Sequence, residues 1–462
     1  MQDAFLGIDI GTTAIKFGVM SADKLAYQQS RDIRTYTGEN GAEYQSAQEI
    51  ITTTVRGIQA IPATIRQQIS QLSFSAPMHS CWPIAPDTTE NDQIFIWSDD
   101  QAQDLISQFK NTPSAREFYL KTGTPIHPMS PFAKIKYSQS ISKYPAQTKW
   151  WGIKELVLQY FTGQARIDYA TASATGLLNL RQLDWDAEIL ADLKIQLEDL
   201  AELVDCTDDF KLLEKVATEL GLSDQVRVYA GASDGCLAAY AGYVATGIPN
   251  SLSIGTSAAA RQVSETIRLD PDRQNFCYYL QPGQYIVGAP SNNGGNVLAW
   301  ASNQLAANKT AFFDELPELL AQSPVGANGV CFMPFLNGER APYWDATKKA
   351  AFKELTAATT RADLVRAIVE GTLLNIRALA EMVGVKTQLT LSGGFFKTPE
   401  LQQLTADILG IDCCLSAANE PIAGLYALIR QSAPHNEATM AKICYDESSH
   451  QQYDQIYQGY FD

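Results

Sequence analysis

One short pattern occurs twice in this chain, at its start and near its middle. Residues 6–14 read LGIDIGTTA, and residues 251–258 read SLSIGTSA. In each copy an apolar run is followed by a Gly-Thr-(Thr/Ser) turn and a second apolar run, a pattern that predicts a β-hairpin. The repeated hairpin predicts that the chain folds as two related halves, each of which opens with the same element.

The turn of this hairpin is suited to binding phosphate. Glycine lets backbone N–H groups approach an anion closely, and the hydroxyls that follow it add side-chain donors. Two such turns, at Gly11 and Gly255, would hold a nucleotide polyphosphate from two sides. The copies differ at Asp9, which corresponds to Ser253, and one carboxylate beside phosphates suits Mg²⁺. A single Gly-Thr-Thr turn is usually only a hairpin, so the prediction depends on the pair.

Strand-like and helix-like segments are mixed along the chain. Residues 93–97 (QIFIW) read as a strand, whereas residues 148–160 and 361–383 read as helices. This mixture predicts an α/β fold. No low-complexity linker divides the sequence, so we place the boundary just before the second hairpin. The expected domains are residues 1–245 and residues 246–462.

The composition limits the partners. Lysine and arginine total 35 against 51 aspartate and glutamate residues, and the formal charge of −16 disfavours nucleic acid and anionic lipid. The sequence has no apolar run of about 18 residues, and its start does not read as a secretory signal. The eight cysteines lack CxxC spacing, which favours reduced thiols. We expect a cytoplasmic protein without nucleic-acid or membrane partners; its oligomeric state stays open, a homodimer included.

Several short motifs follow one another in a fixed order. They are residues 9–13 (DIGTT), 78–79 (MH), 97–99 (WSD), 122–125 (TGTP), 231–235 (GASDG), 254–257 (IGTS), 338–342 (GERAP) and 392–394 (SGG). Together they resemble the FGGY family of carbohydrate kinases, which includes glycerol kinase, xylulokinase and gluconokinase. The resemblance spans nearly the whole chain. It implies an α/β fold of two actin-like (ribonuclease H-like) ATPase domains, an active site in the interdomain cleft, and ATP and Mg²⁺ as cofactors.

Asp234 is the expected general base. It lies in the GASDG motif after the strand-like residues 226–229, at the position that the resemblance assigns to the base. A carboxylate there can accept the proton of the acceptor hydroxyl as the phosphoryl group arrives. Most of the remaining acceleration in phosphoryl transfer comes from positioning and charge stabilisation. The alternative is that Asp234 only forms an Asx-turn in a glycine-rich loop.

The resemblance also implies the nucleotide and metal residues. Asp9 would hold the metal, and Gly338 to Pro342 would have an architectural role in which Glu339 and Arg340 brace the domain. Lys16 offers a mobile positive charge for a β- or γ-phosphate, although it can equally be a solvent-facing strand lysine. The nucleotide residues are Thr12, Thr13 and Lys16 at the first turn, Gly255 and Thr256 at the second, and Gly295, Gly393 and Gly394 beside the ribose and base.

The sugar pocket is expected mostly in the first half. Its residues are Met78, His79, Trp97, Asp99, His127 and Met129. Trp97 can place an apolar face against a carbon chain, while Asp99 and His79 can bind hydroxyls. The alternatives are that Trp97 belongs to the core and that His79 is a buried structural histidine. Gln101 stands where family members often carry a basic residue, so no cation is expected there.

Residues 76–80 (APMHS) and 123–131 (GTPIHPMSP) look most like the gluconokinase branch, which phosphorylates the terminal hydroxyl of a linear sugar acid. The carboxylate of an aldonate needs a donor, and His79, His127, Lys134 and Lys136 are the candidates. Xylulokinase is the nearest alternative. Glycerol kinase fits less well, because its pocket offers an arginine and an acidic residue where Met78 and His79 stand.

Two other protein classes are weighed. An actin-like ATPase switch would share the nucleotide site, but Asp234 and the aromatic pocket residues argue against it. A dinucleotide-dependent oxidoreductase would carry G-x-G-x-x-G before a helix, and residues 7–11 (GIDIG) do not match that pattern.

Overall fold

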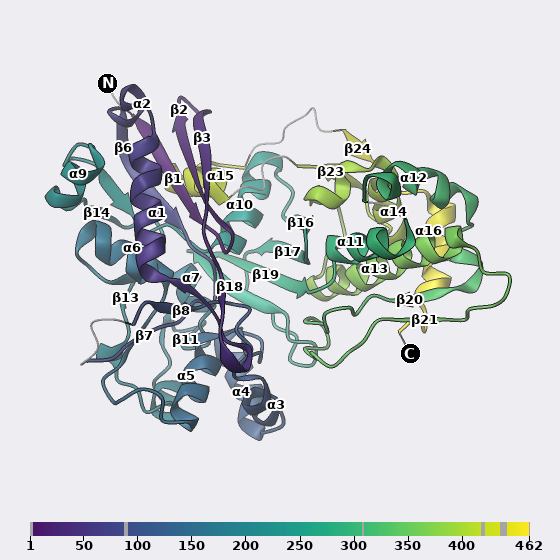
Figure 1. Ribbon diagram of the computed structural model, residues 1–462, viewed down its shortest axis with the longest axis horizontal. Helices are drawn as coiled ribbons and strands as arrows, with labels where there is room; N and C mark the ends of the chain where they lie inside the picture. Colours follow the sequence, from purple (N-terminus) through teal and green to yellow (C-terminus); the bar gives the residue numbers. More distant parts are fainter. Residues whose placement is uncertain (1–2, 87–90, 307–308, 417–420, 435–440, 462) are drawn as a thin grey trace. The chain divides into compact units, whose positions relative to one another are not determined.

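The computed structural model describes residues 3–86, 91–306, 309–416, 421–434 and 441–461 (Figure 1). The chain packs as two compact units. The first contains the chain up to Val244, Glu265–Ile286 and the late helix α15 (Pro421–Ile429), and the second contains Ala245–Ser264 and most of the chain from Val287 onward. The division of the sequence at residue 245 remains our proposal for the two repeated halves.

The first unit is built on a six-stranded sheet. Its strands, in order across the sheet, are β14 (Asp209–Lys211), β15 (Arg227–Tyr229), β6 (Ile69–Ser75), β1 (Ala4–Ile10), β2 (Ala14–Ser21) and β3 (Lys24–Asp32). β1 pairs antiparallel with β2 and parallel with β6, and β6 pairs parallel with β15. Three neighbouring strands therefore end at the same edge of the sheet.

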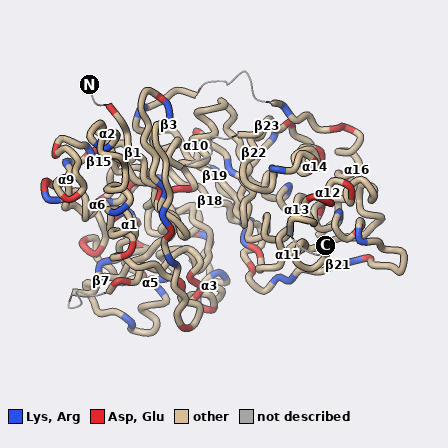
Figure 2. The backbone as a smooth tube through the Cα atoms, turned by 45° about the horizontal axis from the view of Figure 1, so that its top comes forward, with Lys and Arg blue, Asp and Glu red and all other residues tan. Residues whose placement is uncertain are grey.

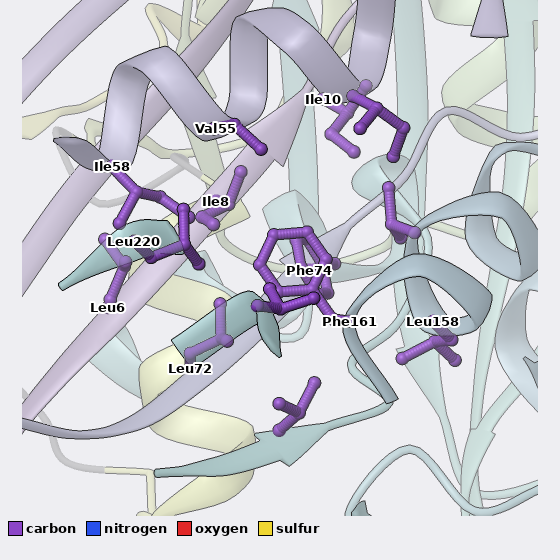
Figure 3. Packing of buried hydrophobic residues seen from close by; sticks show 14 of the residues in the cluster. Leu6, Ile8, Ile10, Val55, Ile58, Leu72, Phe74, Leu158, Phe161 and Leu220 are labelled. Carbon is purple, nitrogen blue, oxygen red and sulfur yellow. The ribbon is translucent and has the colours of Figure 1, made fainter. Parts of the chain in front are cut away.

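Side chains alternate between the two faces of β1, and each face packs on different helices. Leu6, Ile8 and Ile10 enter a buried core with α1 (Ala47–Ala60), α6 (Ile153–Thr162) and α9 (Glu214–Leu220), part of which Figure 3 shows. Gly7 faces the other way, where an added Cβ would come within 2.8 Å of Ile422 in α15. Asp9 shares the face of Gly7, which places its carboxylate away from the α1 core.

The remaining elements of the first unit form smaller sheets and a second hydrophobic core. The small sheets are β4 (Tyr36–Thr37) with β5 (Glu43–Ser46) and β8 (Gln93–Phe95), β7 (Trp82–Ile84) with β9 (Lys149–Trp151), β10 (Arg166–Asp168) with β13 (Glu202–Val204), and β11 (Leu178–Asn179) with β12 (Asp184–Trp185). The helices are α2 (Ala63–Arg66), α3 (Gln103–Lys110), α4 (Pro113–Thr122), α5 (Pro131–Ser140), α7 (Tyr169–Ser173), α8 (Ala187–Asp192) and α10 (Asp234–Thr246), with short 3₁₀ turns at Glu39–Gly41 and Leu197–Asp199.

The second sheet repeats the central pairing of the first. Its order is β18 (Phe276–Gln281), β19 (Gln284–Ser291), β17 (Ala258–Ser264), β16 (Asn250–Ile254), β22 (Leu389–Ser392), β23 (Cys413–Leu415) and β24 (Lys442–Ile443). β16 pairs antiparallel with β17 and parallel with β22, as β1 does with β2 and β6. The predicted hairpin is thus present in both halves.

Helices and short strands complete the second unit. They are α11 (Gly295–Leu305), α12 (Lys309–Gln322), α13 (Arg361–Val383), α14 (Pro399–Leu409), α16 (Glu447–Tyr457), β20 (Cys331–Met333) and β21 (Ala351–Lys353), with 3₁₀ turns at Ala327–Gly329 and Gly394–Lys397. α13 has the bounds predicted from the sequence, and a capping box of Thr360 and Asp363 begins it.

One predicted helix was partly wrong. Residues 149–151 form β9, which pairs with β7, and α6 begins only at Ile153. The aromatic KWW segment gains more from pairing as a strand than from extending the helix, and Gly152 lies at the junction. The predicted strand at 93–97 is shorter, since β8 ends at Phe95.

None of the eight cysteines forms a disulfide in the structure. Within the described ranges, none of the helices combines the length and the apolar character needed to cross a membrane. Acidic and basic residues are interspersed along both units, as Figure 2 shows. The negative net charge is therefore spread over the molecule rather than gathered in one tail.

Candidate active site

The first phosphate turn is fixed from the protein side. The Gly11 N–H donates to the Ala14 carbonyl at 3.0 Å and closes the turn between β1 and β2. The buried Gln45 side chain donates to the carbonyls of Gly11 at 3.3 Å and of Thr12 at 3.1 Å, and the Thr35 hydroxyl donates to Thr12 at 3.0 Å. The turn carbonyls are thus occupied by neighbouring side chains, which holds its backbone in one conformation.

Asp9 lies at the end of β1, in register with Lys16 on β2 and with Ser75 on β6. Its carboxylate is 7% exposed and accepts a hydrogen bond of 2.7 Å from the Ser75 hydroxyl. No group of three His, Cys, Asp or Glu side chains suited to a metal occurs among the described residues. Mg²⁺ needs only one or two protein carboxylates when phosphates and water supply the rest, so Asp9 fits this ion.

Asp234 is the first residue of α10 and follows β15 after a short loop. Its N–H donates to the Ala76 carbonyl at 3.0 Å, and the Ala76 N–H donates to Ala232 at 3.3 Å. β6 therefore lies between Asp9 at the end of β1 and the loop that carries Asp234. Because these parallel strands end at one edge, both carboxylates stand at that edge of the sheet, where open α/β sheets bind ligands.

The Asp234 carboxylate is half-buried at the N-terminus of a 13-residue helix. Its Oδ1 accepts the N–H of Gly235 at 2.7 Å. The N–H groups of the first helical turn and the dipole of the helix stabilise negative charge at this position. This position at a helix start therefore suits a carboxylate that takes part in proton transfer.

Met78 and His79 follow β6 directly, a few residues after the contact between Ala76 and the Asp234 loop. His79 is 7% exposed and has a positive φ of 69°. Its Nδ1 lies 2.8 Å from the Ala174 carbonyl, which can only accept, so Nδ1 carries the proton. The edge of the His79 ring meets Tyr278 at 6.1 Å. A neutral His79 therefore presents Nε2 as an acceptor.

Lys134 connects two of the predicted substrate segments. Its Nζ donates to the His79 carbonyl at 3.3 Å and also to the Met129 carbonyl. Burial lowers the pKa of Lys134 to about 8, and burial raises the pKa of Asp99 nearby. The Asp99 carboxylate accepts the N–H of Glu43 at 3.2 Å. Lys134 thus holds backbone in place, a different role from the carboxylate ligand considered in the sequence.

The other candidate cations differ from one another. The His127 Nδ1 accepts the N–H of Met129 at 3.2 Å, so the neutral ring carries its proton on Nε2 and can donate from there. Lys136 forms an ion pair of 2.7 Å with Asp192 and lies over the ring of Phe109. This lysine is engaged on the outer side of α5, away from the cluster around Lys134.

Trp97 is 37% exposed, so it is not a core residue. Met78 is half-buried and Met129 is 2% exposed. The Cys81 N–H donates to Phe95 at 2.8 Å, which brings the segment after His79 beside β8, just before Trp97. The printed contacts thus join the segments of His79 and Met129 through Lys134, and they bring the segment after His79 beside the end of β8.

The second turn, in the second unit, is closed by the Gly255 N–H, which donates to Ser257 at 2.9 Å. The start of α11 packs on it: the Gly295 N–H donates to Gly255 at 2.8 Å and the Asn296 N–H to Thr256 at 3.1 Å. Gly255 and Thr256 are exposed. The carbonyls of this turn are therefore also occupied, in this case by the N–H groups of a helix start.

Glycines surround this second turn for a steric reason. A Cβ on Gly295 would lie 2.4 Å from the Gly255 oxygen, and one on Gly393, whose φ is 103°, would lie 2.2 Å from the Ile254 oxygen. At Gly394 and Gly255 an added Cβ would meet no protein atom within 4 Å. Two of these glycines permit close backbone packing, and two border open space.

Glu339 braces the loop before α11, as the sequence predicts. Its carboxylate is 1% exposed and accepts hydrogen bonds from the Ser291 hydroxyl at 2.7 Å, the Asn292 N–H at 2.9 Å and the Asn375 amide at 2.8 Å. Burial raises the pKa of Glu339. This network fixes the segment that leads to Gly295.

The sequence analysis missed three residues that position the first-unit groups. Gln45 and Ser75 carry no sequence signal, because a glutamine or serine beside a strand end is common. Lys154 does carry a signal: it lies with Glu155 in an otherwise apolar run of α6, where charged residues are rare unless they are paired.

Two family models match this chain. The N-terminal domain of the FGGY family of carbohydrate kinases matches residues 4–241, and the C-terminal domain of that family matches residues 250–424. Gluconokinase from Bacillus subtilis (strain 168) is 32% identical over 454 residues, which cover 92% of this chain and 88% of that protein. Xylulose kinase from Staphylococcus xylosus is 23% identical, with 87% of this chain and 85% of that protein covered.

Two solved structures, a ligand-bound xylulose kinase and a gluconate kinase, both from Lactobacillus acidophilus, match with a TM-score of 0.92 at 28% identity. Each match covers 99% of this chain, with 97% and 96% of the respective relatives. The predicted two-domain actin-like fold and the predicted kinase class are confirmed by these matches. The chain belongs to the FGGY family of carbohydrate kinases and is an ATP-dependent carbohydrate kinase.

Proposed function

We propose that this kinase transfers the γ-phosphoryl group of ATP to the terminal hydroxyl of gluconate, giving 6-phosphogluconate and ADP. The observation that carries the transfer chemistry is the placement of Asp9 and the Asp234 loop at one edge of the first sheet. Gluconate as acceptor is supported by the 32% identity to a gluconokinase, against 23% to a xylulose kinase. The overall fold does not separate the two substrates, because solved structures named for each match equally well.

Asp234 acts as the base in this proposal. Its carboxylate takes the proton of the acceptor hydroxyl, the hydroxyl oxygen bonds to the γ-phosphorus, and the bond from that phosphorus to the bridging oxygen of ADP breaks. The proton then passes from Asp234 to solvent. Asp234 begins α10, and a helix N-terminus favours negative charge on this side chain.

The nucleotide is held by the two turns. The proposed phosphate contacts are Thr12, Thr13 and Lys16 in the first unit and Gly255 and Thr256 in the second. Gly295, Gly393 and Gly394 lie beside the ribose and base. Mg²⁺ on Asp9, when bound, neutralises charge on the phosphate oxygens. We expect closure of the domains on both ligands, because an open site would let water attack ATP.

His127 is the proposed donor to the gluconate carboxylate. Of the four candidates, Lys134 is bonded to backbone carbonyls, Lys136 is paired with Asp192, and His79 uses Nδ1 on Ala174. The His127 Nδ1 accepts the Met129 N–H, so the neutral ring carries its proton on Nε2, the atom that would donate to the carboxylate in this proposal. His79 Nε2 and Asp99 would then accept substrate hydroxyls, with Trp97, Met78 and Met129 against the carbon chain.

We propose a cytoplasmic enzyme with a small-molecule sugar acid as its partner, and a homodimer stays open. Xylulose, phosphorylated to xylulose 5-phosphate, is the alternative acceptor within the family.

A kinase assay over gluconate, xylulose, ribulose and glycerol tests the proposal by measuring ADP release. Gluconate should give the highest kcat/KM. The His127→Asn variant should lower kcat/KM for gluconate by about 10-fold or more, the value of one hydrogen bond to a charged group, while any activity on neutral xylulose changes less. Higher kcat/KM for xylulose would overturn the assignment of gluconate.

A further inference from the structure

Lys154 is a buried lysine that none of the steps above uses. It lies on α6, and its side chain and that of Asp168 are both 0% exposed. Its Nζ donates to the carbonyls of Phe74 at 2.6 Å, Ala230 at 2.7 Å and Ala232 at 3.4 Å, and lies 3.3 Å from an Asp168 carboxylate oxygen. An ammonium group has three protons, and here every one of them has an acceptor.

The three carbonyls belong to the backbone that presents Asp234. Phe74 lies near the end of β6, and Ala230 and Ala232 lie in the loop between β15 and α10, shortly before Asp234. Gly231 in this loop has a φ of 71°, and a Cβ there would lie 2.2 Å from the Phe74 oxygen. The loop is therefore packed directly on β6, and Lys154 on α6 donates hydrogen bonds both to β6 and to this loop.

Asp168, the counter-ion of Lys154, is connected through α7 to His79, a proposed substrate residue. Asp168 accepts the Thr171 N–H at 2.8 Å and the Thr171 hydroxyl at 2.7 Å, which caps the start of α7. The residue after α7 is Ala174, whose carbonyl accepts the Nδ1 proton of His79. One buried ion pair thus connects the backbone before Asp234 with the segment that orients His79.

A buried charge pair rarely persists for stability alone, because removing two charges from water opposes most of their attraction. An apolar residue would fill the same position on α6 without that penalty. A lysine does what an apolar residue cannot: it fixes three peptide carbonyls at once, each relative to the others.

We propose that Lys154 is a positioning residue of the transfer reaction, whose ammonium fixes the direction in which the Asp234 loop presents its carboxylate to the acceptor hydroxyl, and that Asp168 aligns this loop with His79. The inference rests on the proposed role of Asp234 as base. Lys154 touches neither substrate, so its removal changes the rate of transfer more than the binding of ATP.

The test uses the full-length enzyme, ATP and the best acceptor found in the substrate panel. The Lys154→Met/Asp168→Asn double variant removes both charges, so no unpaired charge is left buried, and the amide oxygen introduced on β10 can still accept from Thr171. We expect kcat to fall by about 10- to 100-fold, the range for a small misplacement of a reacting group, with KM for ATP changed by less than about threefold. The temperature is set where circular dichroism shows a folded protein.

The control for lost stability is Ile58→Ala, on α1 in the core of the same unit and far along the chain from the loop. It should lower Tm and leave kcat unchanged. The second readout is a mutant cycle in which the double variant is combined with Asp234→Asn. In an enzyme that already carries Asp234→Asn, we expect the double variant to lower kcat by less than about twofold. The reason is that residues that act through one another have non-additive effects.

A near-normal kcat in the double variant, or an equal fall in kcat with and without Asp234→Asn, would overturn the positioning role. If the double variant does not fold, Asp168→Asn alone is measured, and an unchanged kcat there overturns the role as well. Failure of the proposed function has a different signature, namely normal turnover by Asp234→Asn itself, and this result would remove both inferences.

Discussion

The two turns have the same backbone plan and different chemical surroundings. In each, a glycine N–H closes the turn, at 3.0 Å from Gly11 to Ala14 and at 2.9 Å from Gly255 to Ser257. The strand before the first turn carries Asp9, which accepts the hydroxyl of Ser75, whereas the second carries Ser253, which accepts from Arg261 at 2.8 Å. An acid in one unit is thus replaced by a neutral hydroxyl in the other.

The parallel neighbours of the two hairpins differ in the same sense. In the first unit, β6 and β15 end beside the Asp234 loop; in the second, Gly393 and Gly394 follow the end of β22. Carboxylates therefore gather at the first sheet edge, and bare backbone gathers at the second. The difference teaches that a duplicated fold can divide its roles: in the proposed mechanism the first unit supplies proton transfer and the metal site, and the second supplies close backbone packing around the nucleotide.

The sharpest way to break this comparison is to remove the proposed base. Asp234→Asn keeps the size of the side chain and its place at the start of α10, but an amide cannot take a proton. We expect kcat to fall by about 10²- to 10⁴-fold, the usual worth of general base catalysis, with ATP affinity retained. Steady-state kinetics and an ATP-binding titration measure the two effects. Asp272→Asn, an exposed aspartate of the same unit, serves as the control.

The pH dependence of unfolding probes the buried charges behind the first sheet edge. Burial raises the pKa of Glu155 from 4.5 to about 7, so the protonated form is favoured in the folded state. The stability that the folded protein has while Glu155 is protonated is fully present below about pH 4.5 and is lost as the pH rises to 7. This loss lowers the free energy of unfolding by about 3 kcal/mol. Glu155→Gln should flatten the curve over this window in denaturant titrations.

The matched control for this curve is Glu447→Gln, an exposed glutamate at the start of α16 in the second unit. The free energy of unfolding of this variant should vary with pH as it does in the wild-type protein. A Glu155→Gln curve as steep as that of wild type would show that Glu155 is already ionised in the folded protein.

Asp9→Ser gives the first unit the residue of the second. The variant loses a charged contact worth about 1.5–3 kcal/mol, which corresponds to a rise of about 10- to 100-fold in KM for Mg-ATP. Kinetics over a range of Mg²⁺ concentrations measure it, with KM for the acceptor as internal reference. Ser253→Ala, the equivalent change in the second unit, should have a smaller effect, and an unchanged magnesium requirement in Asp9→Ser would remove the metal role.

Two adjacent glycines sharpen the comparison from the other side. Gly393→Ala places a Cβ 2.2 Å from the Ile254 oxygen at a φ of 103°, and should destabilise the protein by about 1–3 kcal/mol. Gly394→Ala meets no protein atom within 4 Å and should change stability by less than about 0.5 kcal/mol. KM for ATP should still rise in Gly394→Ala if the nucleotide occupies that space. Thermal unfolding and steady-state kinetics of both variants measure these effects. An unchanged KM for ATP in Gly394→Ala would contradict the proposed role of Gly394 beside the nucleotide.

The hairpins, the long helix α13 and the family were predictable from local patterns. A Gly-Thr turn between two apolar runs is a short-range signal, and α13 carries its own capping box at Thr360 and Asp363. The KWW segment was read wrongly because its strand partner, β7, lies far earlier in the sequence, at residues 82–84. Pairing between distant segments is the part of a fold that local propensity does not contain.

The site residues also differ in whether a local motif or a distant contact determines their place. Asp9 and Asp234 stand in recognisable motifs, but Lys134 was considered as a ligand for a carboxylate, and the structure shows its Nζ on the carbonyls of His79 and Met129. Which group a lysine meets depends on the packing of α5 against other segments. The roles of the motif residues remain predictions for the experiments above.

The late helix α15 has a consequence for synthesis of the chain. It covers Gly7 and Gly18 on the first sheet, although it is made of residues 421–429. At a translation rate of about 5–20 residues per second, roughly 10–40 s separate the end of α10 from the end of α15 on the ribosome. During that interval the place of α15 over Gly7 and Gly18 stays unfilled, so the first unit cannot be completed until nearly the whole chain has been made.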